Sequence, residues 1–356
     1  MIVSRDDILR CSFSKWHSQF SHATLPSRIV PLSAEFIEYL NQDGVFLPLD
    51  SNGMPQPSYD SNRDDDDEDS QHSDSDNSEQ DAEWARDKIP SFPELTARIA
   101  DEIESLGGVV FPKLNWSSPK DATWMTLDGT LRCKTSADIF LLLKSSDFIA
   151  HDLTCPFDAC SAPNATETSN GGDASTVSDF QDYELILRKW YDLNPSMEFR
   201  CFVGNHVLLG ACQRDVLNYY PFLVDTRGDL LRGITQFFEK EIQGKFASSD
   251  YVFDVYINKN TRKVWLIDFN PFSTTTDSLL YDWEELSVSR NDAHEGSVSV
   301  VPLLRVVTGP NSSHNQPAYA TNRIPKDVVD FSDGQSIAEF ARVMAEQMAE
   351  SLNVSK

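Results

Sequence analysis

Two polar side chains, two positions apart near the end of a strand-like segment, are the residues best suited to chemistry. Asp268 and Asn270 alternate with apolar residues in Val264-Trp-Leu-Ile-Asp-Phe-Asn-Pro-Phe272, so on an extended strand both point to one face. A carboxylate and an amide oxygen side by side suit a hard cation such as Mg²⁺, which takes oxygen ligands and keeps phosphate oxygens in its shell. The pair therefore predicts a magnesium site.

A second strand-like segment, Tyr251–Tyr256, supplies a third oxygen donor in Asp254. The polar residues 258–262 follow it, so the two segments together predict a hairpin. Their even-numbered residues, including Val264 and Leu266, are expected on one face, which would bring the oxygens of Asp254, Asp268 and Asn270 together. The alternative for each residue alone is an Asp that caps the hairpin or an Asn-Pro turn, and the three together favour the metal.

Two lysines are candidates for holding phosphate. Lys113 ends a strand-like segment and precedes the loop 117–122, which is rich in hydroxyl groups, and an ammonium group in such a place acts as a point charge for phosphate oxygens. The alternative is a solvent-facing lysine beside Pro112. Lys134 either assists Lys113 or is a surface residue.

The segment Leu187–Tyr191 leaves a predicted strand with a large flat side chain, Trp190. Adenine needs apolar surfaces above and below its ring and one backbone N–H and C=O at its edge, and a strand-to-loop hinge offers both. The alternative is that Trp190 anchors the core. Arg200 and Arg214 lie on predicted strands, where a buried arginine requires a carboxylate or a phosphate; ion pairs with Glu198 or Asp215 are as plausible as phosphate contacts.

The elements that position these residues alternate between helices and hairpins. Pro93 begins a helix that ends at Gly107-Gly108, and Gly204-Asn205 is expected to turn a hairpin. Hairpins with interspersed helices predict an α+β protein with mostly antiparallel sheets. The expected helices cover 93–106, 136–148, 230–242 and 335–352, and the expected strands cover 109–116, 183–191, 198–203, 206–212, 251–256 and 264–270.

Composition narrows the function classes. The 356 residues carry a net charge of −26, which argues against nucleic-acid and anionic-membrane partners and favours a basic protein partner. Twelve acidic residues and one arginine between Asp60 and Glu83 make the segment 56–88 a predicted disordered region. The six cysteines lack paired metal spacing, and without a signal peptide or a long apolar segment we expect a cytosolic or nuclear protein with reduced thiols. Of these two locations we predict the cytoplasm.

The order of the candidate residues resembles the ATP-grasp fold, in which ATP lies between two α+β subdomains. That order is a lysine at a strand end, a loop, a hinge with a tryptophan, a strand with Glu and Arg, and an acidic hairpin. The resemblance implies an ATP-grasp-like α+β fold whose two subdomains, with mostly antiparallel sheets, enclose a nucleotide cleft. The expected parts are an N-terminal helical part over 1–55, the acidic segment 56–88, subdomains over 89–187 (with a flexible insertion at 153–181) and 188–320, and a C-terminal helix and tail over 321–356.

A closer resemblance is to the cell division cycle protein 123 family of eukaryotes. It covers roughly residues 90–290 and the N-terminal helices, and consecutive identities make it specific. The motifs that carry it are Lys113-Leu-Asn-Trp-Ser117, Cys133-Lys-Thr135, Asp138-Ile-Phe-Leu-Leu142, Leu187-Arg-Lys-Trp190, Glu198-Phe-Arg-Cys-Phe202, Gln213-Arg-Asp215 and Trp265-Leu-Ile-Asp-Phe-Asn-Pro-Phe272.

This second resemblance implies an ATP- and Mg²⁺-binding assembly chaperone for translation initiation factor 2, which acts on the gamma subunit so that the alpha subunit can join. It implies that Lys113 holds phosphate, that Lys189 and Trp190 offer hinge backbone to adenine, and that Glu198 meets the ribose. The full set of implied ATP-binding residues is Lys113, Asn115, Trp116, Ser117, Lys134, Arg188, Lys189, Trp190, Glu198, Arg200 and Arg214, and the implied magnesium ligands are Asp254, Asp268 and Asn270.

Two other functions stay open at this point. One is an ATP-grasp ligase that joins a carboxylate to an amine through an acyl phosphate, and the other is a structural protein whose nucleotide site is inactive. The loop after Lys113 lacks the glycines usual in ATP-grasp enzymes and has Ser117-Ser-Pro-Lys-Asp in their place, which favours the chaperone over the ligase. We also expect Asp268→Ala to weaken Mg-ATP binding and to leave the fold intact, because a lone carboxylate at a strand end is not part of the core.

Overall fold

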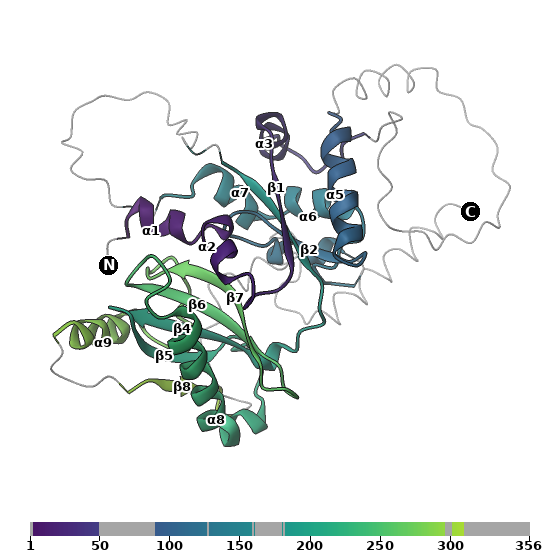
Figure 1. Cartoon of the computed structure of the whole chain (residues 1–356). Coiled ribbons are helices and arrows are strands. Elements are labelled where there is room, and N and C mark those ends of the chain that lie inside the picture. The colour runs from purple at the N-terminus through teal and green to yellow at the C-terminus, as the bar shows by residue number, and fades with distance from the viewer. Residues whose placement is uncertain are drawn as a thin grey trace, which may run out of the picture. The chain divides into compact units, whose positions relative to one another are not determined.

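The computed structural model describes residues 3–49, 90–126, 128–158, 160, 180, 182–295 and 301–309, which belong to one compact unit. It is an α+β fold built on two sheets, as predicted (Figure 1). The acidic segment 56–88, the greater part of the insertion 153–181 and the helix and tail expected over 321–356 lie outside the described residues. No helix among the described residues is long and apolar enough to span a membrane.

The first sheet has three antiparallel strands in the order β1-β3-β2. Helices α3, α5, α6 and α7 enclose one of its faces, and Figure 1 shows this part in its upper half. Pro93 begins α5 as predicted, and Gly107 and Gly108 follow its end with positive φ angles of 98° and 84°. The elements are β1 (Ser27–Pro31), α3 (Ala34–Asn41), α5 (Pro93–Ser105), β2 (Val110–Lys113), η1 (Lys120–Met125), α6 (Ser136–Lys144), α7 (Asp147–Thr154) and β3 (Glu184–Lys189).

Alternation along β3 separates the core from the site. Leu185 and Leu187 point to the helices and are completely buried in the core beneath them. Ile186 and Arg188 point to the opposite face. Lys113 of β2 pairs with Ile186, so its side chain shares that face. The central strand of this sheet therefore presents a lysine and an arginine toward the second sheet.

The second sheet has five strands in the order β7-β6-β4-β5-β8, and only β8 runs parallel to its neighbour. The β4–β5 hairpin turns at Asn205 and His206, whose φ angles are 49° and 61°, one residue later than predicted. Its elements are η2 (Pro195–Met197), β4 (Glu198–Gly204), β5 (Val207–Gln213), α8 (Pro221–Phe237), η3 (Phe238–Ile242), β6 (Tyr251–Ile257), β7 (Val264–Pro271), α9 (Trp283–Glu295) and β8 (Leu303–Arg305).

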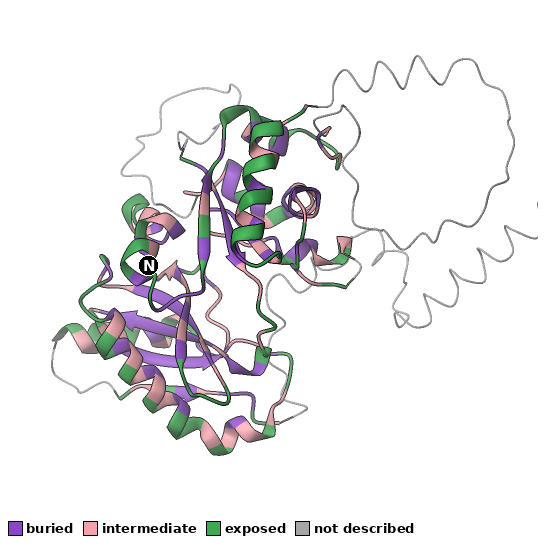
Figure 2. Ribbon diagram, turned by 45° about the vertical axis from the view of Figure 1, so that its right-hand side comes forward, coloured by how far each residue is buried: buried purple, intermediate pink, exposed green. Residues whose placement is uncertain are grey.

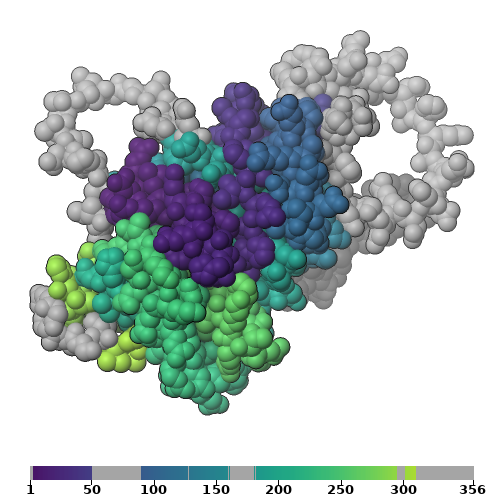
Figure 3. All heavy atoms as spheres, in the orientation of Figure 1, coloured from purple at the N-terminus to yellow at the C-terminus, as the bar shows by residue number. Residues whose placement is uncertain are grey.

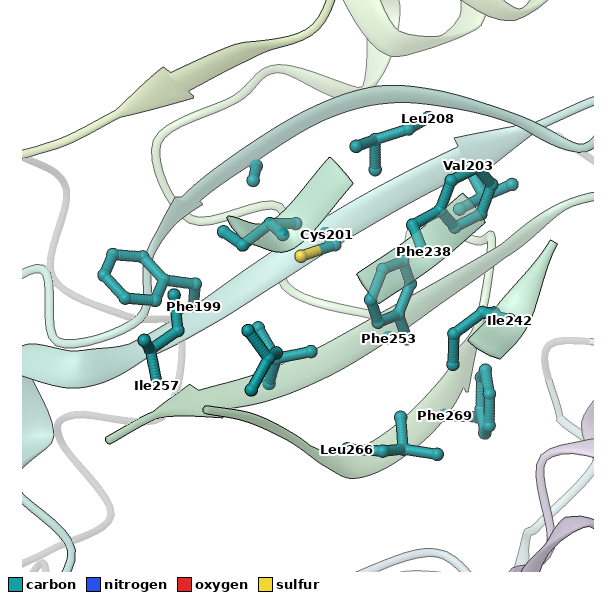
Figure 4. Packing of buried hydrophobic residues seen from close by; sticks show 14 of the residues in the cluster. Phe199, Cys201, Val203, Leu208, Phe238, Ile242, Phe253, Ile257, Leu266 and Phe269 are labelled. Atoms are coloured by element: carbon teal, nitrogen blue, oxygen red, sulfur yellow. The ribbon is translucent and has the colours of Figure 1, made fainter. Parts of the chain in front are cut away.

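One face of the second sheet is largely apolar. Phe199, Cys201, Phe253 and Leu266 point from β4, β6 and β7 into a core that η3 covers with Phe238 and Ile242 (Figure 4). The helix predicted over 230–242 begins earlier, at Pro221, and its last residues form a π-helical turn. In Figure 2 the strands of this sheet are largely buried, whereas exposed residues lie along the outer sides of the helices.

The opposite face of the second sheet changes character along the strands. Phe202 and Val252 lie under Tyr281 and Leu286 at the end that α9 covers. Two residues before Phe202 on the same face, β4 carries Arg200 instead. The sheet thus has an apolar half and a charged half on this face, and the charged half contains the candidate site.

A β-bulge in β7 decides which way its polar residues point. Asp254 faces Asp268, but the next residue of β6, Val255, faces Leu266, so Ile267 is an extra residue in β7. Leu266 consequently points into the apolar core, whereas Asp268 points to the charged face beside Asp254. The expected grouping of Asp254, Asp268 and Asn270 on one face is confirmed, but the expectation that Val264 and Leu266 share it is wrong, because the bulge shifts the alternation.

The N-terminal residues join the two sheets. Helices α1 (Arg5–Arg10) and α2 (Phe13–Phe20) pack against β7, and β1 then enters the first sheet. Trp16 of α2 lies edge-on to Phe269 at 5.3 Å between ring centroids. Figure 3 shows this segment, in purple, over the junction of the upper and lower parts. The region expected to be helical therefore also contains a strand.

Candidate functional site

A row of three charged residues crosses the second sheet. Arg200 of β4, Asp254 of β6 and Asp268 of β7 are direct cross-strand neighbours, so their side chains leave the sheet on the same face. Asn270 lies one step further along β7 on that face, opposite Val252. Strand pairing thus brings the predicted magnesium ligands together, although the turn of the β6–β7 hairpin separates Asp254 from Asp268 and Asn270 in the sequence.

Arginines hold both oxygens of Asp254. Arg200 donates from Nε to Oδ1 at 2.8 Å and from Nη2 to Oδ2 at 2.9 Å, and Arg214 donates from Nε to Oδ2 at 3.1 Å. Arg214 also pairs with Glu198 at 3.3 Å. Burial would raise the pKa of Asp254, but the two guanidinium groups outweigh it and hold the pKa well below its usual range. Asp254 is therefore ionised at every physiological pH.

Lys113 crosses from the first sheet to the second. Its Nζ donates to Oδ2 of Asp268 at 2.6 Å, and its side chain is only 1% exposed. Burial lowers the pKa of Lys113, and the nearby carboxylate of Asp268 counteracts part of that effect. The solvent-facing alternative for Lys113 is wrong, because the lysine is a buried ionic contact between the two sheets.

Lys120 is a site residue that the motifs missed. It begins η1 and lies close enough to Arg214, Glu198 and Asp254 for their charges to affect it. The like charge of Arg214 and then burial lower the pKa of Lys120 to about 8. Its signal in the sequence is that it is the one basic residue of the loop 117–122 that follows Lys113.

The loop that carries Lys120 is anchored at two points on α7. Ser117 donates from its backbone N and from Oγ to Asp152, at 2.8 and 2.9 Å. Asp121 accepts from Ser146 Oγ at 2.6 Å and from the backbone N of Asp147 at 2.7 Å, which caps the start of α7. These anchors hold Lys120 in place without the glycine-rich sequence usual in a mobile phosphate loop.

Arg188 is buried beside the Lys113–Asp268 pair. Its guanidinium lies 5.3 Å from the ring of Phe13 and 5.4 Å from the ring of Phe111, and its Nη1 donates to the carbonyl of Ile267 at 2.8 Å. Its Nε has no hydrogen-bond partner among the described residues. A buried N–H donor such as this Nε suits a ligand that offers acceptor oxygens or nitrogens.

The oxygen donors fit Mg²⁺ held jointly with phosphate. Asp254, Asp268 and Asn270 offer only carboxylate and amide oxygens, which is the donor chemistry that Mg²⁺ prefers. Within the described part of the chain, no group of three His, Cys, Asp or Glu residues is placed to hold a metal ion. The ion would therefore need oxygens from a bound phosphate to complete its shell, as is usual for Mg²⁺ in nucleotide sites.

Three predicted ATP-binding residues have hydrogen bonds within the protein, and their ATP contacts stay predictions. Asn115 donates from Nδ2 to Ser12 and to the carbonyl of Asp182, and its Oδ1 accepts from the backbone N of Glu184. Trp116 donates to the carbonyl of Ile8 at 2.9 Å, and the Ser117 hydroxyl is bonded to Asp152. These residues position the strand end and the loop. Lys134 is exposed next to the first turn of α6, and its ATP contact stays a prediction.

The predicted adenine hinge lies at the end of β3. The backbone N of Lys189 donates to the carbonyl of Pro26, and that of Trp190 donates to the carbonyl of Val109. Neither N–H is therefore free to donate to adenine, although the hinge prediction requires one that is. A cavity of about 450 Å³ adjoins this hinge, and Lys189, Trp190 and Arg132 are among its lining residues. Arg200, Asp254 and Asp268 do not line this cavity, so the cavity and the ionic cluster are separate features. Trp190 packs on the first core, as its alternative interpretation predicted.

Comparisons with known proteins agree on one family. Residues 16–332 match the D123 family. The chain is 38% identical over 340 residues to the translation initiation factor eIF2 assembly protein of Xenopus tropicalis, with 94% of each chain covered, and 38% identical over 358 residues to that of Aspergillus niger, with 98% and 91% covered. It is similar to the structure of Cdc123 from Schizosaccharomyces pombe, with a TM-score of 0.64, 34% identity, and 87% of this chain and 100% of that chain covered.

Proposed function

The chain belongs to the D123 family, and on that premise we propose that it is a cytoplasmic, Mg-ATP-binding assembly protein for eIF2. Its relatives in Xenopus tropicalis and Aspergillus niger are named for the assembly of this factor. We infer further that the gamma subunit is its direct partner, and that the protein thereby supports translation initiation and cell-cycle progression. The resemblance of the motifs supports the choice of subunit.

The nucleotide half of the proposal rests on the balance of charges at the row of Arg200, Asp254 and Asp268. Three cations of this cluster, Lys113, Arg200 and Arg214, form ion pairs with three carboxylates. Lys120 and Arg188 form no ion pair with a described residue, so the cluster lacks negative charge. This deficit occurs in a chain with a net charge of −26, where a surplus of cations is unexpected. A triphosphate between Lys120, Lys113 and Arg214 would supply the missing charge through charge-assisted hydrogen bonds.

We propose that different residues hold the phosphates, the ribose and the metal of Mg-ATP. We infer that Lys113 and Lys120 bind phosphate oxygens, one from each end of the loop between them, and that Glu198 meets the ribose. Asp254, Asp268 and Asn270 would hold Mg²⁺, which neutralises phosphate charge when bound. The two sheets would then form the two walls of an ATP-grasp-like cleft.

Calorimetry with ATP and Mg²⁺ tests the nucleotide half directly. The wild-type protein is expected to bind, and Lys120→Met is expected to weaken binding, whereas Lys15→Met on the outer side of α2 serves as a control. Absence of binding by the wild type would contradict the proposal and would support a structural protein with an inactive site.

Reconstitution tests the assembly half. Purified alpha, beta and gamma subunits are mixed with and without the protein, and heterotrimer is measured by size-exclusion chromatography; we expect more heterotrimer with the protein present and less effect from a nucleotide-site variant. ADP release is followed in the same samples with candidate carboxylates and amines. Ligation of a small molecule with no effect on assembly would show that the ligase alternative is correct.

A further inference from the structure

Arg188 uses two of its three nitrogens to bind backbone and side chain beyond its own sheet. Nη1 donates to the carbonyl of Ile267 in β7 at 2.8 Å, and Nη2 donates to Oγ1 of Thr24 at 3.0 Å. Thr24 in turn donates its hydroxyl to the carbonyl of Leu266 at 2.7 Å. We call this set, Arg188 with Thr24 and the carbonyls of Leu266 and Ile267, the bulge latch.

The latch acts on the residue that creates the bulge. Ile267 has no partner position on β6, because Asp254 faces Asp268 and Val255 faces Leu266. A bulge locally disrupts the ladder of sheet hydrogen bonds. Here the carbonyls of Leu266 and Ile267 bind Thr24 and Arg188, and the backbone N of Leu266 donates to Ala23 at 2.8 Å. The N-terminal segment and β3 thus complete the hydrogen bonding of the bulge.

Without the bulge the polar residues of β7 would point the other way. Side chains alternate along a strand, so if Ile267 took a regular place in the ladder opposite Asp254, every later side chain would move to the opposite face. Asp268 and Asn270 would then enter the apolar core in which Leu266 and Phe269 now lie. The direction of both predicted magnesium ligands therefore depends on the geometry at Ile267.

We propose that Arg188 is a positioning residue that, with Thr24, fixes the β7 bulge and so aims Asp268 and Asn270 into the site. The inference rests on the proposed Mg-nucleotide function for its consequence, although the latch itself is independent of any ligand. Simple packing does not require an arginine at this position, because an apolar residue would fill the same space without the cost of burying a charge. The carbonyl of Ile267 and the hydroxyl of Thr24 need two N–H donors at a fixed separation, and the planar guanidinium of an arginine provides them.

The experiment compares variants that break the latch with one that keeps it. Arg188→Lys retains the charge but cannot reach both acceptors with one fork, and Thr24→Val removes the hydroxyl at nearly constant volume. Thr24→Ser retains the hydroxyl and is the matched control. ATP affinity is measured by calorimetry with Mg²⁺ and, separately, in EDTA, and the ratio of the two affinities gives the metal-dependent part of binding.

We expect the ratio to fall about 10- to 100-fold in Arg188→Lys and Thr24→Val, the usual effect of losing a group that orients a metal ligand. Affinity in EDTA should change little in Thr24→Val, and Thr24→Ser should behave like the wild type. A variant that is less stable but keeps the wild-type ratio would show that the latch only supports the fold, and would overturn the proposal.

Hydrogen exchange gives a readout without nucleotide. Peptides that cover β7 should exchange faster in Arg188→Lys and Thr24→Val than in the wild type, whereas peptides from the β4–β5 hairpin should not change. Unchanged exchange in β7 would contradict the latch even if ATP binding were altered. If the wild type did not bind Mg-ATP but exchange in β7 rose as expected, the proposed function would fail and the latch would stand as a purely structural device.

Discussion

Lys113 and Asp268 are 155 residues apart in the chain, yet their side chains meet at 2.6 Å. The lysine belongs to β2 of the first sheet and the aspartate to β7 of the second. The pair is therefore an ionic bond between the two sheets and, at the same time, the centre of the proposed nucleotide site. Asp268 is not the lone strand-end carboxylate that the sequence indicated, so its removal has a cost for stability as well as for binding.

Asp268→Ala is expected to lower both stability and Mg-ATP affinity. Removing the carboxylate leaves the buried ammonium of Lys113 without its partner, which costs about 3 kcal/mol of unfolding free energy. Urea denaturation measures the loss of unfolding free energy. Calorimetry measures the affinity for Mg-ATP, which should weaken at least tenfold. Asp268→Asn keeps a hydrogen-bond acceptor for Lys113 but not its counter-charge, so it should regain only part of the stability and none of the affinity. The control is Asp101→Ala on the exposed side of α5; equal stability of Asp268→Ala and this control would contradict the ionic role.

Affinity for Mg-ATP should fall as the pH rises above about 8. The folded pKa of Lys120 is lowered to about 8, so the ammonium that we propose binds phosphate is present below that pH and is lost above it. A charged hydrogen bond of this kind contributes roughly tenfold in affinity. Titrations between pH 7 and 9.5 measure the decline. Lys120→Arg remains charged throughout and should show no decline; a wild-type affinity that stays constant to pH 9.5 would argue against phosphate contact by Lys120.

Asp152 should make the protein less stable as the pH rises from about 4 to 7. Burial raises the pKa of this carboxyl to about 7, although hydrogen bonds from Ser117 oppose the shift. The folded state therefore binds a proton that the unfolded state has already released in this pH range, and stability falls by up to about 1.4 kcal/mol per pH unit. Asp152→Asn cannot ionise, so its unfolding free energy should gain on the wild type across this range. Denaturant titrations at several pH values test this, and two parallel curves would contradict it.

Gly210→Ala should destabilise the region where α9 and β8 join the second sheet. A methyl group at Gly210 would overlap the hydroxyl of Tyr281 and lie 2.7 Å from its Cζ. Tyr281 donates that hydroxyl to the carbonyl of Leu303 at 2.8 Å, so the ring has little freedom to move away. We expect a loss of about 1–3 kcal/mol, measured by thermal or urea unfolding.

Gly233→Ala is the opposite control for this substitution. Gly233 lies inside α8, and outside the backbone of that helix the nearest atom to an added methyl group would be Val264 Cγ2 at an ordinary 3.9 Å. Alanine should therefore stabilise the helix by about 0.5–1 kcal/mol. If Gly210→Ala were as stable as Gly233→Ala, the close packing of Tyr281 on β5 would be wrong.

Local patterns were enough to predict the elements that carry the site. Pro93 and the glycines after Leu106 define α5, and the alternation in β4 to β7 defines two hairpins. The polar residues of those hairpins come together because antiparallel neighbours share a face, which is a rule that needs no tertiary information. For this reason Asp254 and Asp268 could be placed side by side from the sequence.

The remaining features depend on contacts that no local pattern encodes. The bulge at Ile267 has no glycine or proline to mark it, and its acceptors are satisfied by Thr24 and Arg188 from distant parts of the chain. Strand β1 was hidden among helical residues because its partner, β3, follows more than 150 residues later. Lys120 was missed because its role depends on Arg214, which another sheet brings near it.

The bulge in β7 has a consequence for how this site can change over time. Loss of the codon for Ile267 would leave Leu266 opposite Val255 and Asp268 opposite Asp254, so the acidic pair would keep its face on a strand without a bulge. The same pair can therefore be presented by a bulged strand, with one residue between the last core position and the aspartate, or by a regular strand with none. A search for the same site in other chains should accept both spacings.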